Sequence, residues 1–226
     1  MKETMRFLRE LKRNNNREWF AASRNHYEHA LETRSALVAR LIGAVAQVDP
    51  SAGCLTERDC TYRIYRDTRF STDKTPYKTH MGIFINPPYG KKSPLGGYYF
   101  HFEPGKFFFA AGNVCHPPKV LAAIRRSIVD NVEEYDELMR DHEFRSVFPT
   151  VGDNLLKTAP KGVDRDWEFV EYVRPRDFVA CTAEDTRLPA WHSDDDALHR
   201  MLVQARRFNR FINYAVEEAL GSDYGD

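Results

Sequence analysis

Residues 61–80 read TYRIYRDTRFSTDKTPYKTH, a stretch in which a strand-like alternation runs into a loop rich in charged side chains. Over 61–67, Tyr62 and Ile64 alternate with polar residues, and this period of two is typical of a half-buried strand. Because an unpaired arginine is costly to bury, we expect the strand to end near Asp67. The arginines beyond that point would then turn toward a common pocket.

The loop after this predicted strand is locally basic. Five cations and two aspartates lie in 63–78, a local excess of three positive charges in a chain whose formal net charge is zero. Guanidinium forks and ammonium groups on one loop can clamp a phosphate or a carboxylate. The predicted ligand-binding residues are Arg63, Arg66, Arg69, Lys74 and Lys78. In the alternative, the same cations pair with Asp67 and Asp73 and form a structural network that holds the loop in shape.

Strand patterns continue after the loop. Alternating apolar residues occupy 80–86, 98–103 and 106–113, and Pro104-Gly105 predicts a hairpin between the last two segments. Helical periodicity and one late strand pattern account for much of the remaining chain. The helical segments are 3–48, 117–142 and 194–220, the sheet region is 60–113, and the late strand is 176–182. We expect a single α+β domain over 1–226, with a mostly antiparallel sheet of about five strands covered by N-terminal and C-terminal helices.

The alternation also assigns faces of the sheet. If Phe100 and Phe102 face the core, then Tyr99, His101 and Glu103 lie on the opposite face, beside the basic loop. A histidine there has a pKa suited to proton transfer. The candidate catalytic residues are Asp67, Tyr77 and His101. A polar sheet face open to solvent has the same pattern, and that interpretation stays open.

Composition excludes several classes of protein. Charged residues make up 29% of the 226 residues and hydrophobic ones 42%, which is typical of a globular chain and not of a disordered or coiled-coil one. The four cysteines, which form no C-x-x-C pair, are predicted to be free thiols: Cys54, Cys60, Cys115 and Cys181. No apolar run approaches the length of a membrane span and no signal-peptide pattern is present. We therefore expect no membrane partner and a cytoplasmic location.

Cofactor and metal motifs are absent from the sequence. It contains no Walker loop, no G-x-G-x-x-G turn and no G-x-S-x-G elbow, so it indicates no cofactor. A metal site built from His80, His101, Cys115 and His116 would lack the usual ligand spacing, and we expect none. The favoured function is binding of an anionic small molecule, phosphate-bearing or carboxylate, by a binding protein or an enzyme. The alternative is a module that docks nucleic acid or an acidic protein on the same loop; zero net charge makes nucleic acid the less favoured partner.

Several motifs, in order, resemble one uncharacterised microbial family. They are NNNREWF at 14–20, R-x-x-RD-x-RF-x-x-DK-x-PYK at 63–78, GKKSP at 90–94, GGYYFHFEPG at 96–105 and LK-x-x-PKG at 156–162. Over nearly its whole length the chain is similar to the family catalogued as domain of unknown function 2461. The resemblance implies family membership and carries over no activity, cofactor or catalytic residue. Asp166-Trp167-Glu168 stands where family members often have Asp-His-Pro, so no histidine role is assigned there.

Overall fold

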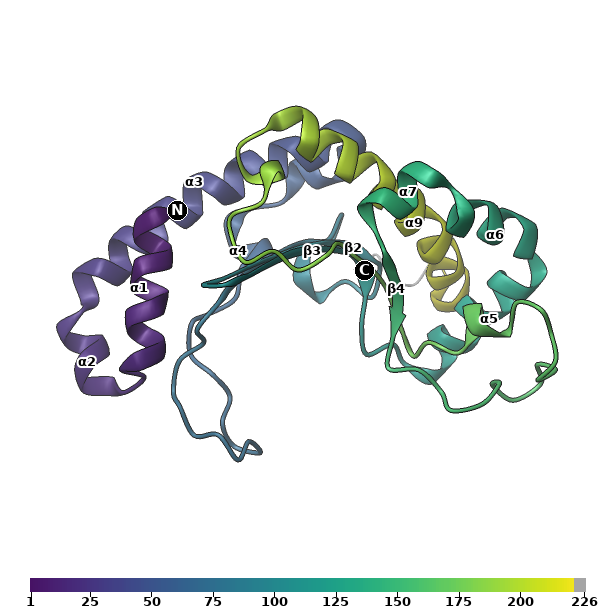
Figure 1. Cartoon of the computed structure of the whole chain (residues 1–226), viewed down its shortest axis with the longest axis horizontal. Helices are drawn as coiled ribbons and strands as arrows, with labels where there is room; N and C mark the ends of the chain where they lie inside the picture. The colour runs from purple at the N-terminus through teal and green to yellow at the C-terminus, as the bar shows by residue number, and fades with distance from the viewer. Residues whose placement is uncertain (222–226) are drawn as a thin grey trace.

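The computed structural model describes residues 1–221, in which helices lie over one face of an antiparallel sheet and to either side of it (Figure 1). The N-terminal helices are α1 (Lys2–Arg13), α2 (Arg17–Ala22) and α3 (Arg24–Val48). Asn16 caps α2 by accepting a hydrogen bond from the Trp19 backbone at 2.8 Å. Phe7 of α1 contacts the rings of Trp19 and Phe20, so α1 and α2 are joined through aromatic side chains.

The five strands and the remaining helices follow. The first of them are η1 (Pro50–Cys54), α4 (Glu57–Cys60), β1 (Met81–Ile85), η2 (Gly90–Lys92), β2 (Gly97–Glu103) and β3 (Lys106–Asn113). After them come α5 (Pro118–Asp130), α6 (Val132–Arg140), α7 (His142–Val147), β4 (Thr150–Asp153), α8 (Val170–Val173), β5 (Asp177–Cys181), η3 (Ala190–His192) and α9 (Asp195–Leu220). The strand order is β1-β2-β3-β5-β4, every pair is antiparallel, and β1 is an edge strand. The expected single α+β domain with a five-stranded antiparallel sheet is confirmed.

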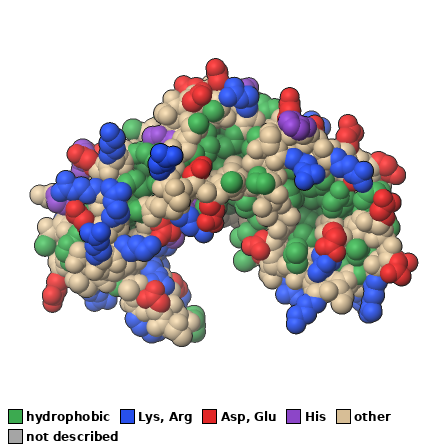
Figure 2. All heavy atoms as spheres, viewed as in Figure 1, with side chains coloured by type: hydrophobic (Ala, Val, Ile, Leu, Met, Phe, Trp, Pro, Cys, Tyr) green, Lys and Arg blue, Asp and Glu red, His purple; other side chains and the backbone are tan. Residues whose placement is uncertain are grey.

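The two faces of the sheet differ in what covers them. On one face Ile83, Phe100 and Phe109 are fully buried, and helices α3 and α9 lie over it. On the other face the register places Gly82 beside His101 and His101 beside Phe108. No helix lies against this second face in Figure 1, and Figure 2 shows the hollow beneath the sheet between the N-terminal helices and the C-terminal half. The second face is called the open face below.

The predicted strand over 61–67 is wrong. Only two isolated bridges form there, Thr61 with Ile83 and Tyr65 with Tyr77. The chain pairs back on itself, since the Arg66 backbone donates to the Pro76 carbonyl at 2.9 Å. Pro76 has no N–H to return that bond, which is one reason why the pairing does not extend into a ladder. Tyr62, expected in the core, is 39% exposed. The fifth strand is instead β4, which lies outside the strand segments predicted from the sequence.

The four cysteines are free thiols in the structure, two of them exposed and two wholly or partly buried. Burial raises the pKa of Cys60 to about 12 and that of Cys181 to about 11, so both are protonated at neutral pH. Among the helices formed by residues 1–221, none combines the length and the apolar character that crossing a membrane requires.

Candidate functional site

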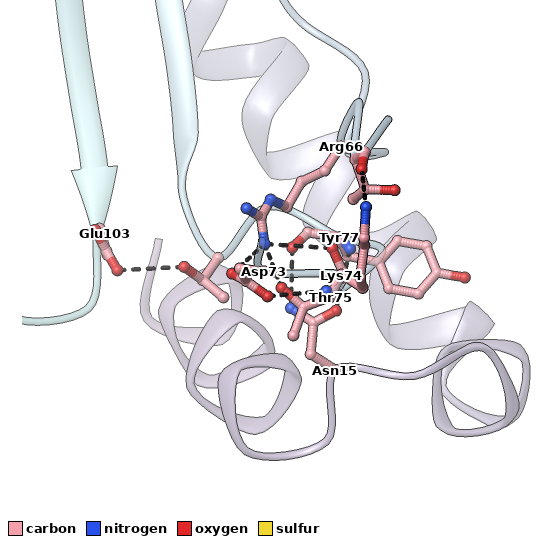
Figure 3. Close-up of polar contacts among 9 residues, drawn as sticks. Asn15, Arg66, Asp73, Lys74, Thr75, Tyr77 and Glu103 are labelled. Atoms are coloured by element: carbon pink, nitrogen blue, oxygen red, sulfur yellow. Dashed lines mark hydrogen bonds and ion pairs between the residues drawn. The ribbon is translucent and has the colours of Figure 1, made fainter. Parts of the chain in front are cut away.

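The basic loop folds into a narrow projection, residues 65–77, which we call the finger (Figure 1). Inside it, the Arg66 guanidinium donates to the Asp73 carboxylate at 2.5 Å and to both the hydroxyl and the carbonyl of Thr75. Figure 3 shows Arg66 and Asp73 pointing toward each other across the finger. The Thr75 backbone N–H and the Arg66 guanidinium lower the pKa of Asp73 to about 2. This pair therefore holds the two sides of the finger together.

The tip of the finger is bonded in the same way. Arg69 donates through Nε and Nη2 to the two oxygens of Asp67, at 3.0 and 2.7 Å, and this bond lowers the pKa of Asp67. The Lys74 ammonium donates to the Thr68 carbonyl at 2.9 Å. Arg66, Arg69 and Lys74 thus have acceptors within the finger. These are the contacts of the structural network that was the alternative to a ligand clamp.

Tyr77 anchors the finger to the N-terminal helices. Its ring is 4% exposed and stacks on Phe20 with centroids 4.1 Å apart. The Asn15 side chain donates to the Tyr77 carbonyl at 2.9 Å and accepts from the Tyr77 N–H at 3.0 Å, as Figure 3 shows. Burial raises the pKa of the Tyr77 hydroxyl. Its position is that of a packing residue between α2 and the finger.

The remaining two predicted cations, Arg63 and Lys78, lie at the base of the finger and line a small pocket beside edge strand β1. We call it the edge pocket; its lining residues are Tyr27, Arg34, Tyr62, Arg63, Ile64, Lys78, His80, Met81 and Gly82. It encloses about 30 Å³, room for a water molecule or two or for part of one small group. The structure therefore does not bring all five predicted ligand residues together: two line this pocket and three are bonded within the finger.

Charge in the edge pocket is only partly balanced. Arg34 is paired with Glu57 through Nε at 3.1 Å and Nη2 at 2.7 Å. Within residues 1–221, the side chains of Arg63 and Lys78 make no hydrogen bond or ion pair; the Lys78 ammonium lies 5.3 Å from the centroid of the Tyr62 ring. Burial and the neighbouring Arg63 charge lower the pKa of Lys78. Arg63 and Lys78 are thus close to each other and neither forms an ion pair within the described residues, although the charge of Arg63 contributes to the lowered pKa of Asp67.

His101, the third predicted catalytic residue, lies on the open face and is 7% exposed. Its Nδ1 is 3.0 Å from the Tyr99 hydroxyl. Its Nε2 lies 3.5 Å from a Glu103 oxygen and makes no hydrogen bond within the described residues. Since an ionised Glu103 favours a proton on Nε2, Nδ1 is the nitrogen that accepts from Tyr99. Burial, reinforced by the nearby His80, lowers the pKa of His101 to about 4.

Glu103 connects this row to the N-terminal helices. Its carboxylate accepts from Lys12 of α1 at 3.2 Å and from the Thr79 hydroxyl at 3.3 Å. Burial raises its pKa, but Lys12, His101 and Thr79 outweigh that effect, and the net shift is downward. Glu103 is therefore an ionised acceptor on the open face.

His80 is the residue that the sequence interpretation missed, having considered it only as a metal ligand. Its ring lines the edge pocket and stacks on His101, with centroids 4.8 Å apart and planes at 26°. It thus joins the pocket to the row of Tyr99, His101 and Glu103. One signal was available in the sequence: His80 follows Lys78 by two residues, and alternate residues of an extended chain share a face.

The conceivable metal cluster does not assemble. His116 lies near Phe178, at the far end of β5 from His80, and Cys115 is exposed. No group of three or more metal-ligating side chains occurs in the part of the chain that the structure describes.

Comparison with known proteins identifies a family. The family model described as "conserved hypothetical protein (DUF2461)" matches residues 3–214, and the chain belongs to that family. No curated protein and no solved structure matches the chain. The suspected resemblance is confirmed at the level of the family.

Proposed function

We propose that this member of the family binds a small anion in the edge pocket, between Arg63 and Lys78. The observation that carries the proposal is that these two cations are neighbours and that neither forms an ion pair with a carboxylate of residues 1–221. Their mutual repulsion and the partial burial of Lys78 destabilise the free pocket, and a bound anion would relieve both. The pocket volume suits the charged group of a ligand, such as a carboxylate or phosphoryl oxygens, with the remainder of the ligand outside.

The other predicted site residues receive supporting roles in this proposal. Arg66, Arg69, Lys74 and Asp67 shape the finger through the bonds described above, and Tyr77 fixes its base. His101 lies behind His80, one ring away from the pocket. Whether the bound anion is then transformed depends on these neighbouring groups, since general acid–base chemistry needs a proton carrier within reach of the ligand.

A thermal-shift measurement with sulfate, phosphate, acetate and citrate at constant ionic strength tests the proposal. An anion present at a hundred times its Kd stabilises the native protein by about 2.7 kcal/mol. We expect Lys78→Ala and Arg63→Ala to lose this stabilisation. The matched controls Lys74→Ala and Arg69→Ala remove one Lys and one Arg from the finger and should keep it. Equal loss in the controls, or no stabilisation of the wild type by any of the four anions, would exclude the edge pocket as the site.

Phe70 favours a second candidate function, a docking surface for single-stranded nucleic acid. Its ring is 96% exposed at the tip of the finger, and the Arg69 guanidinium lies 5.8 Å from its centroid. An exposed aromatic ring flanked by cations can stack on a base while the cations contact phosphates. Fluorescence anisotropy with a labelled single-stranded oligonucleotide at two salt concentrations tests it. Binding that falls steeply with salt and is lost in Phe70→Ala would support this function; anion binding in the edge pocket should depend on salt far less.

A further inference from the structure

The His80 side chain has no hydrogen-bond partner in the part of the chain that the structure describes. Within residues 1–221 neither ring nitrogen makes a hydrogen bond or an ion pair, although the ring is partly buried and lines the edge pocket beside Lys78. A partly buried imidazole normally has an acceptor or a donor for at least one nitrogen. The ring nitrogens of His80 are therefore free to contact a ligand in the pocket.

The orientation of the His80 ring is fixed by the aromatic rings that pack against it on the side away from the edge pocket. Its ring stacks on His101, and His101 in turn stacks on Phe108 with centroids 4.6 Å apart and planes at 14°. The Tyr99 hydroxyl is hydrogen-bonded to Nδ1 of His101, and Glu103 lies 3.5 Å from Nε2, so the orientation of this supporting ring is restricted. Gly82, across from His101 in the register, leaves room for the Tyr99 hydroxyl: a Cβ at position 82 would lie 2.8 Å from it. The three stacked rings form a rigid wall that ends in His80.

We propose that His80 is the third ligand of the anion bound between Arg63 and Lys78, and that it takes up a proton from solvent as the anion binds. This inference rests on the proposed function of the edge pocket. The neutral ring of the free protein becomes an imidazolium, which donates an N–H to an oxygen of the anion. Two permanent charges and one acquired charge match a doubly charged oxyanion, such as sulfate or a phosphate monoester, better than a monocarboxylate.

The charges around His80 give the sign of the effect. Lys78 and Arg63 lie near His80 at the base of the finger, and Glu103 and His101 lie near it on β2. Lys12 of α1 is bonded to Glu103. Arg34 of α3, which also lines the pocket, is paired with Glu57 of α4. In the free protein, burial lowers the pKa of His80; the nearby Glu103 raises it and Lys78 lowers it, and the net shift is downward. A bound dianion adds negative charge beside the ring and raises this pKa. Affinity should therefore increase as the pH falls through the pKa of the complex, and should level off below the pKa of the free protein.

Calorimetric titration with inorganic sulfate measures the proton uptake directly, because sulfate itself does not titrate near neutral pH. Titrations at about pH 6.5, the usual pKa of histidine, in two buffers of different ionisation enthalpy give the number of protons bound with the anion. We expect a fraction of one proton for the wild type and none for His80→Gln. A rise of one unit in the His80 pKa corresponds to about a tenfold gain in affinity between high and low pH. The matched control His199→Gln changes an exposed histidine of α9 and should behave as the wild type.

The possible results separate the two proposals. Sulfate binding without proton uptake by the wild type, or uptake that persists in His80→Gln, would overturn the role of His80 and leave the Arg63–Lys78 pocket standing. A wild type that does not bind sulfate or phosphate would remove the pocket and the inference together. If His80→Gln does not fold, nitrogen-15 chemical shifts of the wild-type histidines decide: the His80 ring must change from neutral to protonated on addition of sulfate, while His101 stays neutral.

Discussion

In the finger each cation has an oxygen acceptor. In the edge pocket, a few residues away along the chain, two cations lie close together, and neither has such an acceptor among residues 1–221. Arg66 and Arg69 are bonded to Asp73 and Asp67, and both pairs lie within the loop that supplies them. Arg63 and Lys78 are neighbours at its base, and burial together with the charge of Arg63 lowers the pKa of Lys78. The difference teaches that a basic stretch has two uses, to hold a loop in shape and to leave positive charge unpaired for a ligand.

The largest expected effect concerns the anchor of the finger. Tyr77→Ala removes a ring that is 4% exposed and stacked on Phe20, so we expect a loss of about 3 kcal/mol in the free energy of unfolding. Tyr62→Ala, in the edge pocket, removes a ring that is 39% exposed and should cost less than about 1 kcal/mol. Urea unfolding of the two variants checks the contrast. Similar losses in both would mean that the finger is not docked through Tyr77.

Low pH should reduce the free energy of unfolding, because His101, in the row of stacked rings beside the edge pocket, must then be protonated. Burial lowers the pKa of His101 to about 4 in the folded protein, from the 6.5 that is usual for histidine in an unfolded chain, so the unfolded chain binds the proton more tightly. Stability is then at its full value above about pH 6.5 and falls as the pH drops toward about 4, by roughly 3 kcal/mol in all. His101→Gln keeps an acceptor for Tyr99 and should lose much less over this range. Denaturant unfolding at several pH values measures it, and parallel curves for wild type and variant would contradict the assignment.

A smaller effect separates the two pairs within the finger. The Arg66 side chain is 26% exposed and bonds to Asp73 and Thr75, so we expect Arg66→Ala to cost about 1 kcal/mol. Arg69 is 77% exposed, and Arg69→Ala should leave stability within experimental error. Unfolding curves at low and high salt check both variants. If Arg66→Ala were stabilising, Arg66 would belong with the unpaired cations of the pocket.

Sequence patterns predicted the part of the fold in which local periodicity and the final packing agree. Alternation in 98–103 and 106–113 becomes β2 and β3, because Phe100 and Phe109 face a helix-covered core. The alternation in 61–67 is equally clear but leads only to isolated bridges. One reason is that Arg66 pairs with a segment of its own loop that contains Pro76. Strand β4 has only four residues and a glycine with a φ of 82°, so no periodicity marks it.

The candidate site was predictable in its chemistry and only partly in its members. Counting charged residues located the basic stretch. The bonds from Arg69 to Asp67 and from Arg66 to Asp73 depend on how the loop turns, and the spacing of these residues in the sequence does not predict that turn. The position of His80 against His101 depends on the register between β1 and β2, a tertiary feature. A single sequence therefore indicates where charge accumulates, and the fold decides which charges stay unpaired.

The smallest expected effect is also the most direct comparison of the two regions, because it removes one lysine from each. Lys74 donates to the Thr68 carbonyl on an exposed loop, so Lys74→Ala should lower the stability of the free protein slightly, by less than about 0.5 kcal/mol. Lys78 is half-buried, unpaired and repelled by Arg63, so Lys78→Ala should leave stability unchanged or raise it by a similar amount. Melting temperatures recorded side by side in anion-free buffer resolve the sign. A clear loss of stability in Lys78→Ala would show that its ammonium has a structural partner in solution, and the edge pocket would then resemble the finger.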